Sequence, residues 1–202
     1  MNHGPKHALL FGGTVALAVG LTACGAVRLV SPAEALLKPK NLRFEEGTYA
    51  GKLPNGWAIG RGHGTPEDYS FRLDEDVKHG GRASLMITYK ARRLRRHGGM
   101  NQCINGEDVA GRVRFTGYIK SSNVTGDGAS LWIQALDNDG TSVAFQNMDG
   151  RRVRGTADWA EHAVEIDVER AARLICFGSF LGGPGTAWFD DHALTVPKGR
   201  ER

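Results

Sequence analysis

Hydrophobic and polar residues alternate with a period of two along much of the chain between residues 41 and 196. Such alternation is typical of strands that bury one face. Gly, Asn and Asp separate the runs, and the chain holds 28 glycines, as expected of antiparallel strands joined by tight turns. The pattern predicts an all-β, two-sheet antiparallel sandwich without helical crossovers. The expected strands are 41–46, 55–59, 67–73, 83–89, 99–104, 111–121, 129–136, 142–147, 161–168, 172–181 and 186–195.

Two of these expected strands, 111–121 and 129–136, carry a distinctive set of side chains on their polar sides. The set is Arg112, Arg114, Tyr118, Trp132 and Gln134. Because the connection between the two strands is short, we expect them to be neighbours and the five side chains to share one sheet face. An exposed Trp beside Tyr, Arg and Gln can stack on a sugar ring and bind its hydroxyls or carboxylates. The alternative is that a loop covers the aromatic rings, which then only pack.

The first 24 residues follow a different pattern. A polar lead with one cation, Lys6, precedes 13 mostly apolar residues, 8–20. This run is shorter than the roughly 20 residues that span a bilayer, and it fits the apolar region of an export signal. Leu21-Thr22-Ala23-Cys24 follows and resembles the bacterial lipobox, whose cysteine is diacylated and becomes the mature N-terminus. We expect a lipoprotein signal peptide over 1–23 and a lipid-anchored chain in the bacterial cell envelope; the alternative is a buried N-terminal helix.

Export also divides the rest of the chain. Lipidated Cys24 begins a tether over 24–40, a single domain covers 41–196, and 197–202 forms a disordered tail. Bacterial lipoproteins retained at the inner membrane carry Asp after the lipidated cysteine, where this chain has Gly25. The outer membrane is therefore favoured if the organism has two membranes.

Cys103 and Cys176 remain once Cys24 is assigned to lipid. An even pair in an oxidising compartment is expected to form a disulfide, and both residues lie in expected strands that could face each other. Closing so long a loop would stabilise the fold by roughly 4 kcal/mol in the chain-entropy model. Two buried free thiols are the alternative.

The stretch KARRLRRH concentrates positive charge. Its cations are Lys90, Arg92, Arg93, Arg95 and Arg96. In a cytoplasmic protein such a cluster would suggest nucleic acid, but the export signal leads us to expect no nucleic-acid binding. In the envelope, the loop could meet an anionic surface of phospholipid, lipopolysaccharide phosphate or acidic glycan, each cation adding about 1 kcal/mol. The alternative is a solvated loop that raises solubility.

The sequence offers little for catalysis. It contains no G-x-S-x-G, H-E-x-x-H or Walker pattern, and its seven histidines have no metal-ligand spacing. Asp158, Glu161 and His162 fall close together, but hydrolysis needs two carboxylates roughly 5 to 10 Å apart across a cleft. Neighbours on one strand point to opposite faces. We therefore expect a protein that is not an enzyme.

Several motifs follow one another in a fixed order along the domain. They are Asn41-Leu-Arg-Phe-Glu-Glu-Gly47, Pro54-Asn-Gly-Trp57, His79-Gly-Gly-Arg-Ala-Ser-Leu85, Gly111-Arg-Val-Arg-Phe-Thr-Gly-Tyr-Ile-Lys120 and Thr186-Ala-Trp-Phe-Asp-Asp-His-Ala-Leu194. Their content and order resemble the carbohydrate-binding-module-like, galactose-binding-type jelly rolls. The resemblance implies a jelly-roll β-sandwich and a glycan or envelope polysaccharide as ligand. Many relatives lack sugar binding, so the alternative is a protein-interaction or structural lipoprotein.

The resemblance also implies a structural calcium. In these jelly rolls the first and last strands lie side by side, and acids near both ends hold the ion. The matching positions are Glu45, Asp190 and Asp191. Carboxylates brought together repel one another without a cation, and calcium prefers oxygen ligands. The alternative is that Arg43 or a backbone amide neutralises them.

Overall fold

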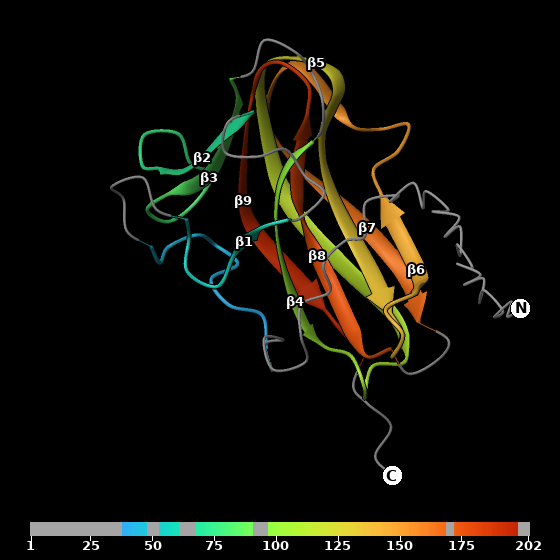
Figure 1. Cartoon of the computed structure of the whole chain (residues 1–202). Coiled ribbons are helices and arrows are strands. Elements are labelled where there is room, and N and C mark those ends of the chain that lie inside the picture. The colour runs from blue at the N-terminus through green and yellow to red at the C-terminus, as the bar shows by residue number, and fades with distance from the viewer. Residues whose placement is uncertain (1–37, 48–52, 61–67, 91–96, 169–171, 198–202) are drawn as a thin grey trace, which may run out of the picture.

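The computed structural model describes residues 38–47, 53–60, 68–90, 97–168 and 172–197. Regular structure in these ranges consists of β-strands (Figure 1). The strands are β1 (Ala58–Ile59), β2 (Tyr69–Asp74), β3 (Ser84–Tyr89), β4 (Gly98–Asn105), β5 (Gly111–Leu136), β6 (Ser142–Asn147), β7 (Val153–Val168), β8 (Leu174–Gly182) and β9 (Thr186–Thr195). Within the same ranges, no helix is long and apolar enough to cross a membrane.

Some of the sequence predictions concern other parts of the chain. The expected signal peptide, Cys24 and most of the tether lie outside the described residues. The same holds for four cations of the KARRLRRH loop, which are Arg92, Arg93, Arg95 and Arg96. Lipidation, envelope localisation and the contact with an anionic surface therefore stay predictions.

The long strand β5 joins the two layers of a sandwich. Its first half pairs with β7 and β9, and its second half pairs with β6 and β8, all antiparallel. One layer therefore has the order β2-β3-β9-β5-β7, and the other has the order β1-β4-β8-β5-β6. Between the halves, Gly126 and Gly128 have φ angles of 79° and 101°. These conformations are open to glycine at little cost, and they let the chain change layers.

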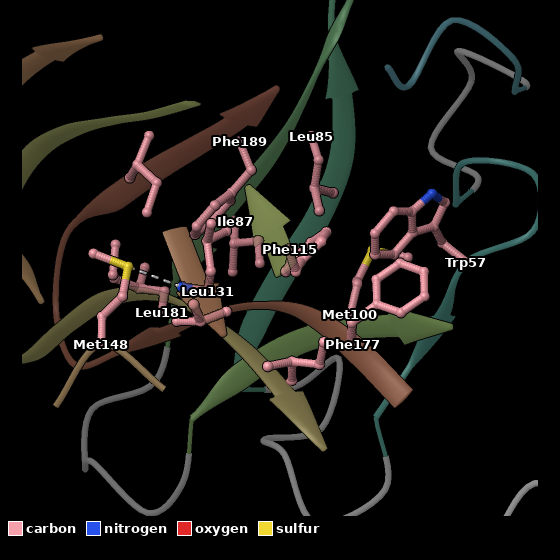
Figure 2. Packing of buried hydrophobic residues seen from close by; sticks show 14 of the residues in the cluster. Trp57, Leu85, Ile87, Met100, Phe115, Leu131, Met148, Phe177, Leu181 and Phe189 are labelled. Carbon is pink, nitrogen blue, oxygen red and sulfur yellow. Dashed lines mark hydrogen bonds between the residues drawn. The ribbon is translucent and has the colours of Figure 1, made fainter. Parts of the chain in front are cut away.

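The core fills the space between the two layers (Figure 2). Phe115 of β5 meets Phe177 of β8 across this space, with ring centroids 4.9 Å apart. Leu85, Leu131 and Phe189 are fully buried around them. Each such side chain contributes about 1.5–3 kcal/mol on leaving water. The all-β, two-sheet prediction is confirmed, because the alternating residues of facing strands meet in one apolar interior.

The segment 38–47 is held on the domain by side-chain hydrogen bonds and by single backbone contacts, such as His192 N to Leu42 O at 2.9 Å, and not by a strand ladder. The Gln102 amide accepts a hydrogen bond from Lys40 N and donates one to Lys40 O, both at 2.9 Å. Trp57 Nε1 donates to Asn41 O at 3.0 Å. The strand expected over 41–46 is wrong, because Asn41 and Phe44 adopt left-handed φ angles of 48° and 58°, which interrupt the regular extended backbone.

Candidate functional site

A disulfide lies at the centre of the outer side of the layer that contains β8. Cys103 of β4 is directly opposite Cys176 of β8, and the two sulfur atoms are 2.05 Å apart. Both cysteines are buried. They pack with Trp132, Leu136, Leu174 and Phe180 in a second apolar cluster, separate from the main core. This cluster covers the face of the sheet that points away from the facing layer.

The strand register shows which residues share this outer face, because directly paired residues of antiparallel strands point to the same side. One row across the sheet is Ala58, Asn101, Gly178, Trp132 and Asn147. The next row is Cys103, Cys176, Gln134 and Phe145. We call these two rows the amide face. They contain three side-chain amides and no charged side chain.

Trp132 is not the exposed aromatic plate that the sequence predicts. It is 9% exposed and packs with Phe180 and the disulfide. Beside it on β8 lies Gly178, where a Cβ atom would come within 2.1 Å of the Met100 carbonyl oxygen. A side chain at this position would clash with the Met100 carbonyl, so the sheet surface next to the Trp132 indole is formed by backbone atoms of Gly178.

Phe145 is the exposed aromatic residue of the amide face. It is 55% exposed and lies directly opposite Gln134, which is partly exposed. Asn101 and Asn147 are partly exposed in the next row, and the Asn147 Oδ1 atom accepts a hydrogen bond from Asp149 N at 2.8 Å. An exposed ring beside amides that both donate and accept can stack on a pyranose and bind its hydroxyls.

Phe145, Asn101 and Asn147 are not among the site residues predicted from the sequence. The turn Asp137–Gly140 is a sequence signal for the position of Phe145. In this turn, Asp137 Oδ1 accepts hydrogen bonds from Asp139 N and Thr141 N. This turn sets the register of the β5–β6 hairpin, and hence places Phe145 beside Gln134. No local signal pointed to Asn101, which reaches the face through the long-range pairing of β4 with β8.

The remaining residues of the predicted face lie on the other layer. The Tyr118 ring stacks on His79 with centroids 3.6 Å apart and an interplanar angle of 15°. Arg112 Nη2 and Asp167 Oδ2 are 2.7 Å apart, in a cross-strand ion pair between β5 and β7. The expectation that these residues share a face with Trp132 is wrong, since the two halves of β5 belong to different layers.

Arg114 forms a second cross-strand ion pair with Glu165 of β7, next to that of Arg112. The Asp167 carboxylate beside Arg112 has a lowered pKa, chiefly because the guanidinium donates hydrogen bonds to it. Both arginines are therefore bound to acids of this chain. They form an ion-pair ladder on the outer side of the β5–β7 pair.

The three acids near the chain ends are held by N–H donors. Asp190 is fully buried, and its Oδ2 atom accepts hydrogen bonds from the backbone of His79 and Gly80 at 2.9 and 3.1 Å. Burial raises the pKa of Asp190, although these hydrogen bonds oppose the rise. Glu45 accepts from Arg82 N with both oxygens, at 3.0 and 2.8 Å.

Asp191 is the partner of two cationic or ionisable side chains. Its Oδ1 accepts from Arg43 Nε at 2.7 Å, and its Oδ2 lies 2.7 Å from His79 Nδ1. Burial favours the neutral acid, but the hydrogen bonds from His79 and Arg43 outweigh it and lower the pKa of Asp191. Asp191 is therefore ionised and paired.

Comparisons with known proteins bear on the fold. No family model matches the chain. An uncharacterized HTH-type transcriptional regulator of Bacillus subtilis (strain 168), YbfP, is 29% identical over 148 residues, which are 72% of this chain and 49% of that protein. The chain thus spans about half the length of the curated relative that it matches.

This chain superposes on two solved structures over most of the length of each. The first CBM22 xylan-binding domain of Paenibacillus barcinonensis Xyn10C superposes with a TM-score of 0.51 at 16% identity, over 78% of this chain and 92% of that domain. A cyclase from Fischerella sp. in its apo form superposes with a TM-score of 0.54 at 15% identity, over 84% of this chain and all of that one. The fold is the jelly roll of carbohydrate-binding modules.

In this jelly roll the three terminal acids do not fit calcium. The described residues contain no group of three or more His, Cys, Asp or Glu side chains that could hold a metal ion. The hydrogen atoms of four backbone amides and of the Arg43 guanidinium occupy directions from which a cation would approach Glu45, Asp190 and Asp191. The charge that neutralises Asp191 comes from Arg43, as in the alternative given above.

One pair of side chains in the jelly roll has the composition of a catalytic pair. Ser179 Oγ and His192 Nε2 are 3.1 Å apart, a distance compatible with a nucleophile and its base. However, both side chains are buried, and burial lowers the pKa of His192 to about 3. Asp158, from the grouping noted in the sequence, binds Lys120 Nζ at 2.6 Å.

Proposed function

We propose that the chain is a non-catalytic, lipid-anchored protein of the bacterial cell envelope whose jelly roll binds a glycan or envelope polysaccharide. The apolar leader and the lipobox ending at Cys24 support the anchor. The fold supports a carbohydrate ligand, because the superposed domain from Paenibacillus barcinonensis is a xylan-binding domain. Many folds serve several functions, so the ligand has to be argued from the site.

The observation that carries the glycan proposal is the exposed Phe145 ring beside the Gln134 amide. The ring offers an apolar plate to the C–H side of a sugar, while Gln134, Asn101 and Asn147 offer hydrogen bonds to hydroxyls. Each hydrogen bond contributes roughly 0.5–1.5 kcal/mol. We therefore expect weak binding of a monosaccharide and stronger binding of a chain that covers both rows of the amide face.

The absence of charge on the amide face indicates an uncharged glycan. A uronate or phosphate bound there would lose water without meeting a cation, at a cost that uncharged hydroxyls do not have. Arg152, which packs over the Phe180 ring at 5.3 Å, is already paired with Asp149 at 3.2 Å and with Asp127 at 3.6 Å.

Retention on immobilised polysaccharides tests the proposal. The full chain, purified in mild detergent, is passed over neutral and acidic polysaccharides, with Phe145→Ala and Gln134→Ala as test variants and Tyr118→Ala, on the other layer, as the control. We expect at least a tenfold loss of retention for Phe145→Ala and none for Tyr118→Ala. Equal retention of Phe145→Ala and wild type would remove the amide face from the function.

Two further measurements address the anchor and catalysis. Mass spectrometry of the native chain should find a diacylated Cys24 at the N-terminus, and an unmodified sulfur with Met1 present would refute the anchor. The cyclase of similar fold makes a turnover assay necessary. Turnover of peptidoglycan or polysaccharide that disappears in Glu161→Ala would show an enzyme.

A protein-interaction or structural lipoprotein is the second candidate. The burial of Trp132 favours it, because the aromatic residue expected to bind sugar is part of a packed cluster. The match to the Bacillus subtilis regulator fits a recognition module that serves proteins of different kinds. If no polysaccharide is retained, while a specific envelope protein is captured by wild type and lost with Phe145→Ala, this candidate replaces the first.

The cationic loop supports an additional contact with an anionic surface. Lys90, at the beginning of the loop, is exposed, and its N–H donates to Asp68 O at 2.8 Å. We expect the full chain to bind vesicles containing anionic lipid more strongly than neutral vesicles, and salt to remove the difference. Replacing the five cations of the loop with Gln tests this, and unchanged binding would exclude the contact.

A further inference from the structure

Two exposed apolar side chains lie on a strand at the edge of the sheet. β6 pairs with β5 on one side, and no strand in the described part of the chain pairs with its other side. Val143 and Phe145 are 47% and 55% exposed, the largest exposures among the bulky apolar residues described. An uncovered strand edge offers free N–H and C=O groups to another chain.

β6 also lacks the charged residues that normally protect an edge. Its sequence is SVAFQN, without Lys, Arg, Asp or Glu. By contrast, β7 carries several charges, and the Arg151 guanidinium donates to the Ala163 carbonyl of β7 at 2.6 Å. β2 carries the Arg72–Asp74 ion pair at 3.2 Å, and β1 is only two residues long. Of the described edge strands, β6 is therefore the one open to pairing.

We propose that β6 pairs antiparallel with β6 of a second copy of this chain, in a two-fold symmetric dimer. A two-fold axis sets the strand against itself, so like charges on it would repel across the new pair. β6 has no charge and meets no such penalty. β7 is a poorer edge for this operation, because it is charged along its length and its Ala163 carbonyl already accepts a hydrogen bond from Arg151.

The pairing has a geometric consequence for the outer surface. An antiparallel pair related by a two-fold axis perpendicular to the sheet keeps the same side of both sheets uppermost. The amide faces of the two copies would thus form one continuous surface, with Phe145 of each copy near the centre. A six-residue strand is roughly 20 Å long. This contact is small beside the roughly 1,200 Å² of a stable complex, so the dimer is expected to be weak and concentration-dependent.

Cysteine cross-linking in native membranes tests the pairing with the full chain. Single variants Ser142→Cys, Ala144→Cys and Gln146→Cys scan β6, and Glu161→Cys on β7 is the matched control. After mild oxidation, non-reducing electrophoresis measures the linked dimer. We expect at least one β6 position to give fivefold more dimer than the β7 control, and peptide mapping should find the introduced cysteines of two copies linked to each other and not to Cys103 or Cys176.

A charge placed on the edge distinguishes pairing from random collision. Val143→Lys, added to the best β6 cysteine variant, should reduce cross-linking to the level of the β7 control, because the two-fold pair would then carry two like charges on the same short strands. Mapping of the intact Cys103–Cys176 link verifies that each variant is folded. Equal cross-linking from β6 and β7, or cross-linking that Val143→Lys leaves unchanged, would overturn the dimer. Neither result depends on whether a glycan binds.

Discussion

Arg43 and Asp191 are joined by a hydrogen-bonded ion pair of 2.7 Å although 148 residues separate them in sequence. The pair connects the N-terminal segment with β9, at the place where the family resemblance led us to expect a calcium ion. A cation of the chain itself thus lies between the two ends of the domain. The neighbouring acids Asp190 and Glu45 accept hydrogen bonds from the backbone amides of His79, Gly80 and Arg82.

The first prediction concerns metal removal. We expect the melting temperature of the full chain to be the same in EDTA and in millimolar calcium. Arg43→Met should lower it in both conditions, because Asp191 then keeps His79 but loses the guanidinium. Differential scanning calorimetry measures the effect, with Lys78→Met as a control at a nearby exposed cation. A rise in the melting temperature of the wild type on adding calcium would show that Glu45, Asp190 and Asp191 do bind the ion.

The second prediction concerns the disulfide. Cys103 and Cys176 are 73 residues apart, and a link of this length contributes roughly 4 kcal/mol in the chain-entropy model. The double variant Cys103→Ala/Cys176→Ala should therefore unfold at a markedly lower urea concentration than the oxidised wild type. Reduced wild type should unfold close to the variant. Identical midpoints for all three forms would mean that the β4–β8 ladder alone holds these strands together.

The third prediction concerns acid. His192 is neutral in the folded chain, with its pKa lowered from 6.5 to about 3 by burial. Below about pH 6.5, His192 binds a proton in the unfolded chain but stays neutral in the folded chain. The free energy of unfolding therefore falls as the pH decreases from 6.5 towards 3. The expected slope for one such group is about 1.4 kcal/mol per pH unit.

Urea titrations at several pH values between 5.5 and 7 measure this slope. The double variant Ser179→Ala/His192→Leu removes both members of the buried pair and leaves neither without its partner. It should lose most of the slope, whatever its stability at pH 7. A slope equal to that of the wild type would assign the acid sensitivity to other groups, such as the half-buried His162.

The fourth prediction separates packing from ligand binding at Trp132. Truncation of a buried Trp to Ala costs about 3–5 kcal/mol, and Trp132 packs beside the disulfide and Phe180. Trp132→Ala should therefore lower the urea midpoint strongly, and Trp132→Phe should recover part of the loss. Phe145→Ala, at an exposed site, should leave the midpoint nearly unchanged. Full stability of Trp132→Ala would indicate that the indole does not support the fold.

Much of the fold could be predicted from the sequence because it depends on local alternation. The strands around Phe115 and Leu131 follow the period of two, and their apolar residues meet in the core. The predictions at Asn41 and Phe44 are wrong because left-handed backbone conformations interrupt an apparently suitable pattern. No alternation of apolar and polar residues reveals such a conformation at a residue other than glycine.

The candidate site could be predicted only in part. Gln134 lies on the amide face, as the alternation indicates, and Trp132 lies on the same side but is buried. The expectation that Arg112, Arg114 and Tyr118 lie on this face is wrong, because a short connection does not make the two halves of β5 neighbours in one layer. The glycines between the halves of β5 carry the chain across the sandwich instead. Layer assignment depends on long-range pairing, which a local pattern does not contain.

The clamp between Gln102 and Lys40 determines how the domain would respond to tension. If the N-terminal side is fixed to a membrane and the outer surface to a polysaccharide, a pull enters the domain at Lys40. The two amide hydrogen bonds of Gln102 carry that load first, followed by the bond from Trp57 to Asn41 O. Behind this clamp the pull reaches β9 and the core, because His192 N donates to Leu42 O at 2.9 Å, Arg43 pairs with Asp191, and Phe44 is fully buried between the layers.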